Sequence, residues 1–115
     1  MSNDQDDTVR KAAIRSLNDQ FRKTFTGGAV VITAGIAALD DATRQRIFAA
    51  VKTFDAFDEA NDPWHEHDFG AVEVGGQRVF FKLEYYDLTR AMHSEDAADP
   101  TKTERVMTIM LASEY

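Results

Sequence analysis

The sequence has no cysteine and only two prolines in its 115 residues. Without cysteine the chain can form no disulfide, no cysteine-ligated zinc or iron–sulfur site and no thiol nucleophile. It also lacks an apolar run long enough to cross a bilayer, and its polar, acidic N-terminus lacks the apolar stretch of a signal peptide. We therefore expect a cytoplasmic protein without a membrane partner.

Positive charge is in the minority as well. The chain has 13 Lys and Arg residues against 20 Asp and Glu residues, which gives a formal net charge of −7. Nucleic-acid binders depend on cations that neutralise phosphates, so direct nucleic-acid binding is not expected. An acidic surface instead favours solubility and basic partners, and in some small inhibitors it imitates DNA.

The length and composition fit one domain. A chain with 43% hydrophobic residues can bury a core of its own. We expect residues 1–7 to form a disordered acidic tail and residues 8–115 to form a single α+β domain.

The hydrophobic pattern predicts helix, strand, helix and then three strands. Apolar residues recur at helical spacing over 8–25 and again from Asp40 or Asp41 to Phe54 or Phe57. The apolar run 29–34 predicts a buried strand. Segment 104–112 is apolar on both faces; a buried helix is an alternative, but its β-branched residues favour a central strand. The expected fold is two amphipathic helices on one face of a mainly antiparallel four-stranded sheet.

A two-glycine turn organises the second half of the chain. Gly75 and Gly76 suit a two-residue hairpin loop, because such turns need positive φ. In that register Glu73 faces Arg78, and Gly70 faces Phe81, so that a ring covers bare backbone. A shift of one residue would lose these matches and swap the two faces.

The same register assigns a face to each side chain of the hairpin. One face is almost purely apolar and is expected to face the core: Val72, Val74, Val79, Phe81, Leu83 and Tyr85. The other face mixes charges with aromatic rings: Phe69, Ala71, Glu73, Arg78, Phe80, Lys82, Glu84 and Tyr86. The second face is a half-solvated sheet surface or, since aromatic and Arg side chains are enriched at interfaces, a binding surface.

Extended beyond the strands, this register predicts that His67 lies opposite Glu84. The carboxylate would then fix the tautomer of the imidazole, with Tyr86 as a hydrogen-bond donor nearby. His65, Glu66, His67 and Asp68 also suggest a metal site, yet two His residues two apart are a weak motif. No nucleophile is evident, so we expect no cofactor and lean away from catalysis. The simpler interpretation is a structural network of hydrogen-bonded polar residues that holds the end of the hairpin to a loop.

Several motifs together resemble a family catalogued only as domain-of-unknown-function family 3768. They are FTGG (Phe25 to Gly28), TAG (Thr33 to Gly35), NDP followed by EHDFG (Asn61 to Gly70), YYD (Tyr85 to Asp87) and RVMTIMLASEY (Arg105 to Tyr115). The resemblance implies a bacterial protein, common in alphaproteobacteria and on their plasmids, and it implies no activity. His65 falls at a variable position of the family's pattern, which weakens the two-His metal interpretation. Occurrence on mobile elements favours an accessory or host-interaction role.

The leading hypothesis is a small acidic protein-binding module, a regulator or inhibitor that acts through the polar-aromatic face of the 68–87 hairpin. The residues expected to contact the partner are Trp64, Glu66, His67, Asp68, Phe69, Arg78, Phe80, Lys82 and Tyr86. The first alternative is a hydrolase-like or metal-assisted enzyme centred on Glu66, His67, Asp68 and Glu84. The second alternative is a DNA-mimic inhibitor. An unpaired edge strand would also allow a homodimer.

Overall fold

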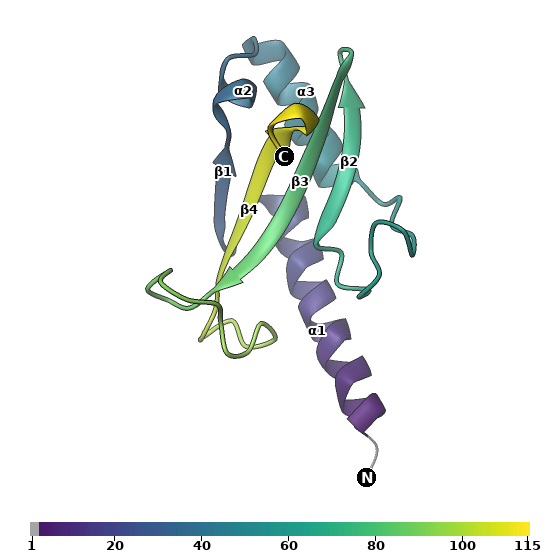
Figure 1. Cartoon of the computed structure of the whole chain (residues 1–115), viewed down its shortest axis with the longest axis vertical. Helices are drawn as coiled ribbons and strands as arrows, with labels where there is room; N and C mark the ends of the chain where they lie inside the picture. The colour runs from purple at the N-terminus through teal and green to yellow at the C-terminus, as the bar shows by residue number, and fades with distance from the viewer. Residues whose placement is uncertain (1–2) are drawn as a thin grey trace.

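Four strands form one mixed sheet in the order β1-β4-β3-β2, and two long helices lie behind it (Figure 1). The computed structural model describes residues 3–115. Its elements are α1 (Asn3–Thr24), β1 (Ala29–Ile32), α2 (Ala34–Ala37), α3 (Asp41–Thr53), β2 (Phe69–Val74), β3 (Gln77–Tyr86), β4 (Glu104–Leu111) and the 3-10 helix η1 (Ala112–Glu114). The predicted α+β class and order of major elements are confirmed, while α2 and η1 were not predicted.

The hairpin β2–β3 has the predicted register. Gly75 and Gly76 form its turn with φ of 58° and 79°, values that favour glycine. Glu73 pairs with Arg78 and Gly70 with Phe81, as the cross-strand matches indicated. The expected inner face is largely confirmed, since Val74, Val79, Phe81 and Leu83 are buried.

The last strand, β4, occupies the centre of the sheet. It pairs antiparallel with β3 and parallel with β1, so the strand prediction for segment 104–112 is confirmed. Met107 and Ile109 are fully buried, and Met110 on the opposite face is only 7% exposed. β1 is consequently an edge strand, and the expectation that it is buried was wrong: Val31 and Ile32 are 44% and 36% exposed.

Helix α3 begins at Asp41, one of the two predicted starts, and Asp40 caps it. Asp40 accepts a hydrogen bond from the Thr43 backbone N–H at 3.3 Å and one from the Thr43 hydroxyl. These bonds satisfy an N-terminal donor of the helix. Ile47 and Val51 from α3 are fully buried beneath the sheet.

Helix α1 differs from the prediction at its start. It begins at Asn3, five residues before the expected start at Thr8, and its N-terminal part extends past the end of the sheet (Figure 1). The rest of the predicted tail, Met1 and Ser2, lies outside the described residues, and the division into tail and domain stays a prediction. Helices normally place charged residues on their solvated face, but Arg22 of α1 is only 2% exposed. None of the described helices is long and apolar enough to span a membrane.

The core lies between the helices and the inner face of the sheet. Its fully buried members come from both layers: Phe21, Ile36, Ile47, Val51, Val79, Phe81, Met107 and Ile109. Buried polar residues lie beside them at one end: Asn18, Arg22, Asp62, Thr103 and Arg105. This polar end of the core adjoins the loop that precedes the hairpin.

Candidate functional site

Three aromatic rings meet on the face of the sheet that no long helix covers. Phe69 and Phe80 lie opposite the helices on β2 and β3, with ring centroids 5.1 Å apart. Tyr115 packs against Phe80 at 5.6 Å and against Phe69 at 6.0 Å. Arg78 lies over the Phe80 ring at 5.7 Å and Lys82 over the Tyr115 ring at 5.6 Å. We call these five residues the outer aromatic face.

The C-terminal turn places Tyr115 on this face. The Glu114 carboxylate accepts hydrogen bonds from the Thr33 hydroxyl at 2.6 Å, the Leu111 N–H at 2.9 Å and the Gly35 N–H at 3.0 Å. Hydrogen bonds from Thr33, and then from these backbone groups, hold the pKa of the Glu114 carboxyl below its usual value. The clamp ties η1 to the β1–α2 connection and so positions the last residue.

The outer aromatic face contains four of the predicted contact residues, namely Phe69, Arg78, Phe80 and Lys82. Tyr86, a fifth, lies on the same side near the far end of β3. Its hydroxyl donates to Glu84 at 3.1 Å, and its ring stacks against His93 with centroids 5.9 Å apart. The hydrogen bond to Glu84 raises the pKa of the Tyr86 hydroxyl. Tyr115 was missed, because its position depends on a fold-back at the chain end that has no periodic signal.

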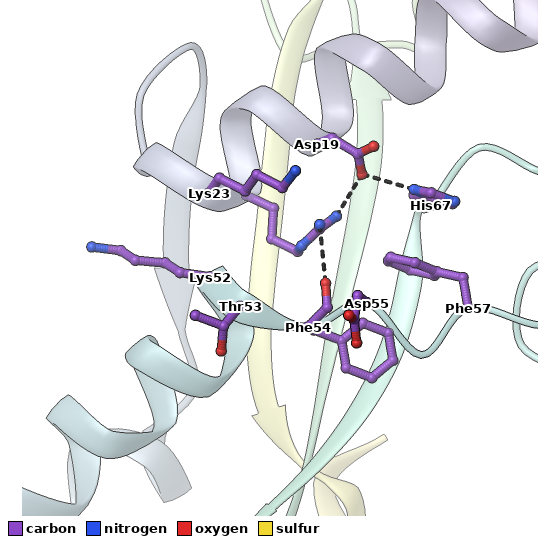
Figure 2. Close-up of a pocket in the computed structure, with 9 residues that line it drawn as sticks. Asp19, Lys23, Lys52, Thr53, Phe54, Asp55, Phe57 and His67 are labelled. Atoms are coloured by element: carbon purple, nitrogen blue, oxygen red, sulfur yellow. Dashed lines mark hydrogen bonds and ion pairs between the residues drawn. The ribbon is translucent and has the colours of Figure 1, made fainter.

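His67 does not pair with Glu84. The β2–β3 ladder ends at Phe69, and His67 adopts φ of 57°, a left-handed conformation that turns its side chain towards α1. Its Nδ1 donates to Asp19 Oδ1 at 2.8 Å, and its ring stacks on Phe57 at 3.8 Å (Figure 2). The predicted His67–Glu84–Tyr86 site therefore does not form.

Asp62 fixes this conformation from inside the loop. Its carboxylate is 3% exposed, and Oδ1 accepts the backbone N–H groups of Glu66 and His67, each at 3.0 Å. Asp62 Oδ2 also lies 3.6 Å from His67 Nε2. Both ring nitrogens thus face carboxylates, Nδ1 through a hydrogen bond to Asp19 and Nε2 at a longer distance from Asp62.

Asp19 links the imidazole to a buried guanidinium. Its Oδ1 also accepts from Arg22 Nη1 at 2.8 Å. Burial raises the pKa of the Asp19 carboxyl, but hydrogen bonds from Arg22 and His67 and the charges of both residues outweigh it, so the pKa is lower than usual. The result is a chain of hydrogen-bonded side chains, Arg22, Asp19 and His67, that holds the loop before β2 against α1.

Glu66 belongs to a second buried network. Its carboxylate accepts the Tyr85 hydroxyl at 2.9 Å, and its backbone carbonyl accepts Asn18 Nδ2 at 2.9 Å. Asn18 also donates to the Tyr85 oxygen at 2.7 Å and accepts from Arg105 Nε at 2.9 Å. Burial, followed by the effect of Glu66, raises the pKa of Tyr85 strongly. The predicted polar network at the end of the hairpin therefore exists, with Asn18 as its centre.

Two further predicted contact residues lie away from the outer aromatic face. Trp64 is 63% exposed on the loop beside α1, where Lys11 Nζ lies 5.7 Å from its ring centroid. Asp68 is half-buried, and burial together with the negative charges of Glu66 and Asp62 raises the pKa of its carboxyl. Across residues 3–115, no group of three His, Asp or Glu side chains is placed to hold a metal ion.

Sequence reasoning missed the residues that organise the buried end: Asn18, Asp19, Arg22, Phe57, Asp62 and Arg105. Polar residues in a helix are normally assigned to its solvated side, so the residue types of Asn18 and Arg22 did not indicate that they are buried. The one available signal was that Asn18 and Arg22 lie among Ile14, Phe21 and Phe25 on the helical wheel.

A pocket lies beside this charged chain, between the ends of the two long helices. Its volume is about 470 Å³, and Figure 2 shows Lys23, Lys52, Phe54 and Phe57 around it. The lining residues are Asp19, Arg22, Lys23, Lys52, Thr53, Phe54, Asp55, Phe57 and His67. The pocket and the outer aromatic face lie on opposite sides of the sheet.

The fold and these two surfaces define a small α+β protein with one uncovered sheet face. A family model described as "Protein of unknown function (DUF3768)" matches residues 32–114. The chain therefore belongs to this family, as its motifs indicated. No curated protein and no solved structure matches it.

Proposed function

We propose that this chain is a protein-binding module that acts through the outer aromatic face. The observation that carries the proposal is the contact among Phe69, Phe80 and Tyr115, which come from three separate segments and lie on a sheet face that no long helix covers. Aromatic and Arg side chains are enriched at the centres of protein interfaces. The role would be that of a cytoplasmic regulator or inhibitor.

The charges on the face favour a particular kind of partner. Arg78 and Lys82 each lie over a ring, where their cationic groups border the apolar surface. Arg78 also lies 3.6 Å from Glu73, so its charge is partly compensated, whereas Lys82 has no ion pair among the described residues. A partner segment with an apolar centre and a carboxylate at its edge would match this pattern.

Trp64, Glu66, His67 and Asp68 are no longer part of the proposed contact surface. The Glu66 side chain bonds to the Tyr85 hydroxyl on β3 and the His67 side chain bonds to Asp19 on α1, and both hydrogen bonds are partly buried. Their contacts support a structural role. The proposed surface gains Tyr115 in their place.

The test is affinity capture from cells of the source organism, followed by mass spectrometry. The tagged wild-type chain is compared with Phe69→Ser/Phe80→Ser and with the control Leu88→Ser/Met92→Ser. The control also removes two apolar side chains, which are 64% and 71% exposed on the 87–103 connection. We expect a partner that is recovered with wild type and control and reduced about tenfold with the face variant, equivalent to about 1.4 kcal/mol.

Equal recovery with both double variants would refute the proposal. Near-ultraviolet circular dichroism of each variant verifies that its tertiary packing is intact. Because both replaced rings are half-exposed, the face variant is expected to fold.

A further inference from the structure

Strand β1 is an open edge of the sheet without the usual protection. It is the last strand in the order and pairs only with β4 (Figure 1). Residues 24–39, which include β1, contain no charged residue and no proline. The opposite edge, β2, has Glu73, whose side chain is 75% exposed. Sheets normally protect an open edge with charges, proline or a bulge, so the difference between the two edges indicates that β1 is available for pairing.

The open side of β1 presents backbone hydrogen-bonding groups. In a parallel ladder, alternate residues of a strand direct their N–H and C=O groups towards the neighbouring strand. The Thr33 N–H donates to the Ile109 carbonyl of β4 at 3.2 Å, so Val31, two residues earlier, also faces β4. Val30 and Ile32 therefore direct their backbone groups away from the sheet, where another strand could bond to them.

The side chains at this edge are apolar on both faces of the sheet. Val31 is 44% exposed beside Thr108, and Ile32 is 36% exposed beside Ile109. Single exposed apolar side chains are common, and a strand as short as β1 limits association by itself. The test must therefore separate specific pairing from mere exposure.

We propose that β1 pairs with β1 of a second copy of this chain, antiparallel and centred on Val31. Two copies that close about a two-fold axis place the identical strands antiparallel. The residues with outward backbone groups, Val30 and Ile32, then pair with each other across the axis. Val31 lies opposite its equivalent as a non-hydrogen-bonded pair, with Cα atoms about 4.5 Å apart. Because residues 24–39 are uncharged, the strands meet without like charges although each chain has a net charge of −7.

The pairing has a consequence for the outer aromatic face. One row of paired residues crosses the sheet from β1 to β2: Val31, Thr108, Lys82 and Phe69. Val31 thus lies on the same side of the sheet as the outer aromatic face. A two-fold axis perpendicular to the sheet keeps both copies of that face on one side, so a partner would meet two of them. This consequence rests on the proposed function, whereas the strand pairing does not.

The test is disulfide cross-linking of the full chain, which has no native cysteine. Val31→Cys places two sulfurs opposite each other, and a Cα separation of about 4.5 Å lies within the range of disulfides. The controls are Met92→Cys, at a site that is 71% exposed, and Ile32→Cys, which the register places opposite Val30. With oxidised glutathione and equal protein concentrations, we expect Val31→Cys to form covalent dimer at least about tenfold faster than either control.

Equal rates for the three variants, or a faster rate for Ile32→Cys, would overturn the proposal. The advantage of Val31→Cys should also disappear in denaturing urea. If it persists there, it arises from the local sequence and not from strand pairing, and the proposal is wrong. No binding partner takes part in this experiment, so its result is separate from the test of the outer aromatic face.

Discussion

At the scale of single residues, Asn18 links α1 to the sheet and to the loop before the hairpin. Its side chain donates hydrogen bonds to the Glu66 carbonyl and the Tyr85 hydroxyl and accepts one from Arg105 Nε. The residue is completely buried. Removing it leaves several buried polar groups without a partner, and such groups cost far more than a lost surface bond.

We therefore predict that Asn18→Ala lowers the free energy of unfolding by about 2–4 kcal/mol in urea denaturation. The matched control is Gln20→Ala, an exposed polar residue on the same helix, with an expected change within about 0.5 kcal/mol. Equal effects of the two substitutions would show that the network around Asn18 contributes little.

Asp19 makes the attachment of the loop to α1 depend on pH. The pKa of its carboxyl is lower in the folded protein than the usual value of 3.8, because Arg22 and His67 favour the ionised form over the effect of burial. A carboxyl with a lowered pKa stabilises the fold above its unfolded pKa, and this contribution is lost as the pH falls through its folded pKa.

Asp19→Asn should accordingly lower the free energy of unfolding by about 1–2 kcal/mol at pH 7, since a quarter of the side chain is exposed and charged hydrogen bonds are partly screened there. The difference from wild type should shrink as the pH falls below 3.8. Asp55→Asn, which changes an exposed neighbour in the same pocket, is the control and should alter the free energy of unfolding at pH 7 by less than about 0.5 kcal/mol. A difference that does not vary with pH would contradict the assignment.

At the scale of elements, the hairpin is the part that the sequence predicted best. Its turn and pairing depend on local chemistry: two glycines that accept positive φ, and complementary pairs such as Glu73 with Arg78. The prediction failed two residues beyond the ladder, at His67, because its partners are Asp19, 48 residues away, and Asp62. No local pattern encodes such a contact.

The edge position of β1 was missed for a related reason. An apolar run such as AVVI is equally compatible with a central and an edge strand. The parallel pairing of β1 with β4 joins segments about 77 residues apart, and it places the last strand in the middle of the sheet. Strand identity was therefore predictable from pattern, whereas strand order was not.

Gly70 offers a direct test of the hairpin packing. A Cβ at this position would lie 2.5 Å from Phe81 Cε1 and 2.8 Å from Phe54 Cε1. Gly70→Ala is therefore expected to cost about 1–3 kcal/mol of stability, measured by denaturant unfolding. In a Phe81→Leu background the added cost should fall, because the clashing ring is absent. A cost that is unchanged in that background would show that backbone effects, and not the ring, are responsible.

At the scale of the whole molecule, the sheet has an unprotected edge. β1 has no charge, proline or bulge, and Val31 is 44% exposed at this edge. Such an edge can pair with a second strand. We expect a monomer–dimer equilibrium in sedimentation velocity experiments at high protein concentration, and we expect Val31→Lys to shift it to monomer. A wild-type chain that stays monomeric at every concentration would contradict this expectation.

The two sides of the sheet carry different kinds of side chain. The helical side has the buried charge networks and the pocket at the ends of α1 and α3, while the other side presents the outer aromatic face. We propose partner binding on the second side because its rings are accessible and its shape is fixed by the hairpin and by the hydrogen bonds of Glu114.

The most direct test of that assignment is hydroxyl-radical footprinting of the chain alone and in complex with its captured partner. Side chains that become inaccessible in the complex lose labelling. The account predicts that Phe69, Phe80 and Tyr115 are protected, while the exposed controls Trp64 and Met92 are labelled as before. Protection of Trp64 and Met92 with unchanged labelling of the three rings would contradict it.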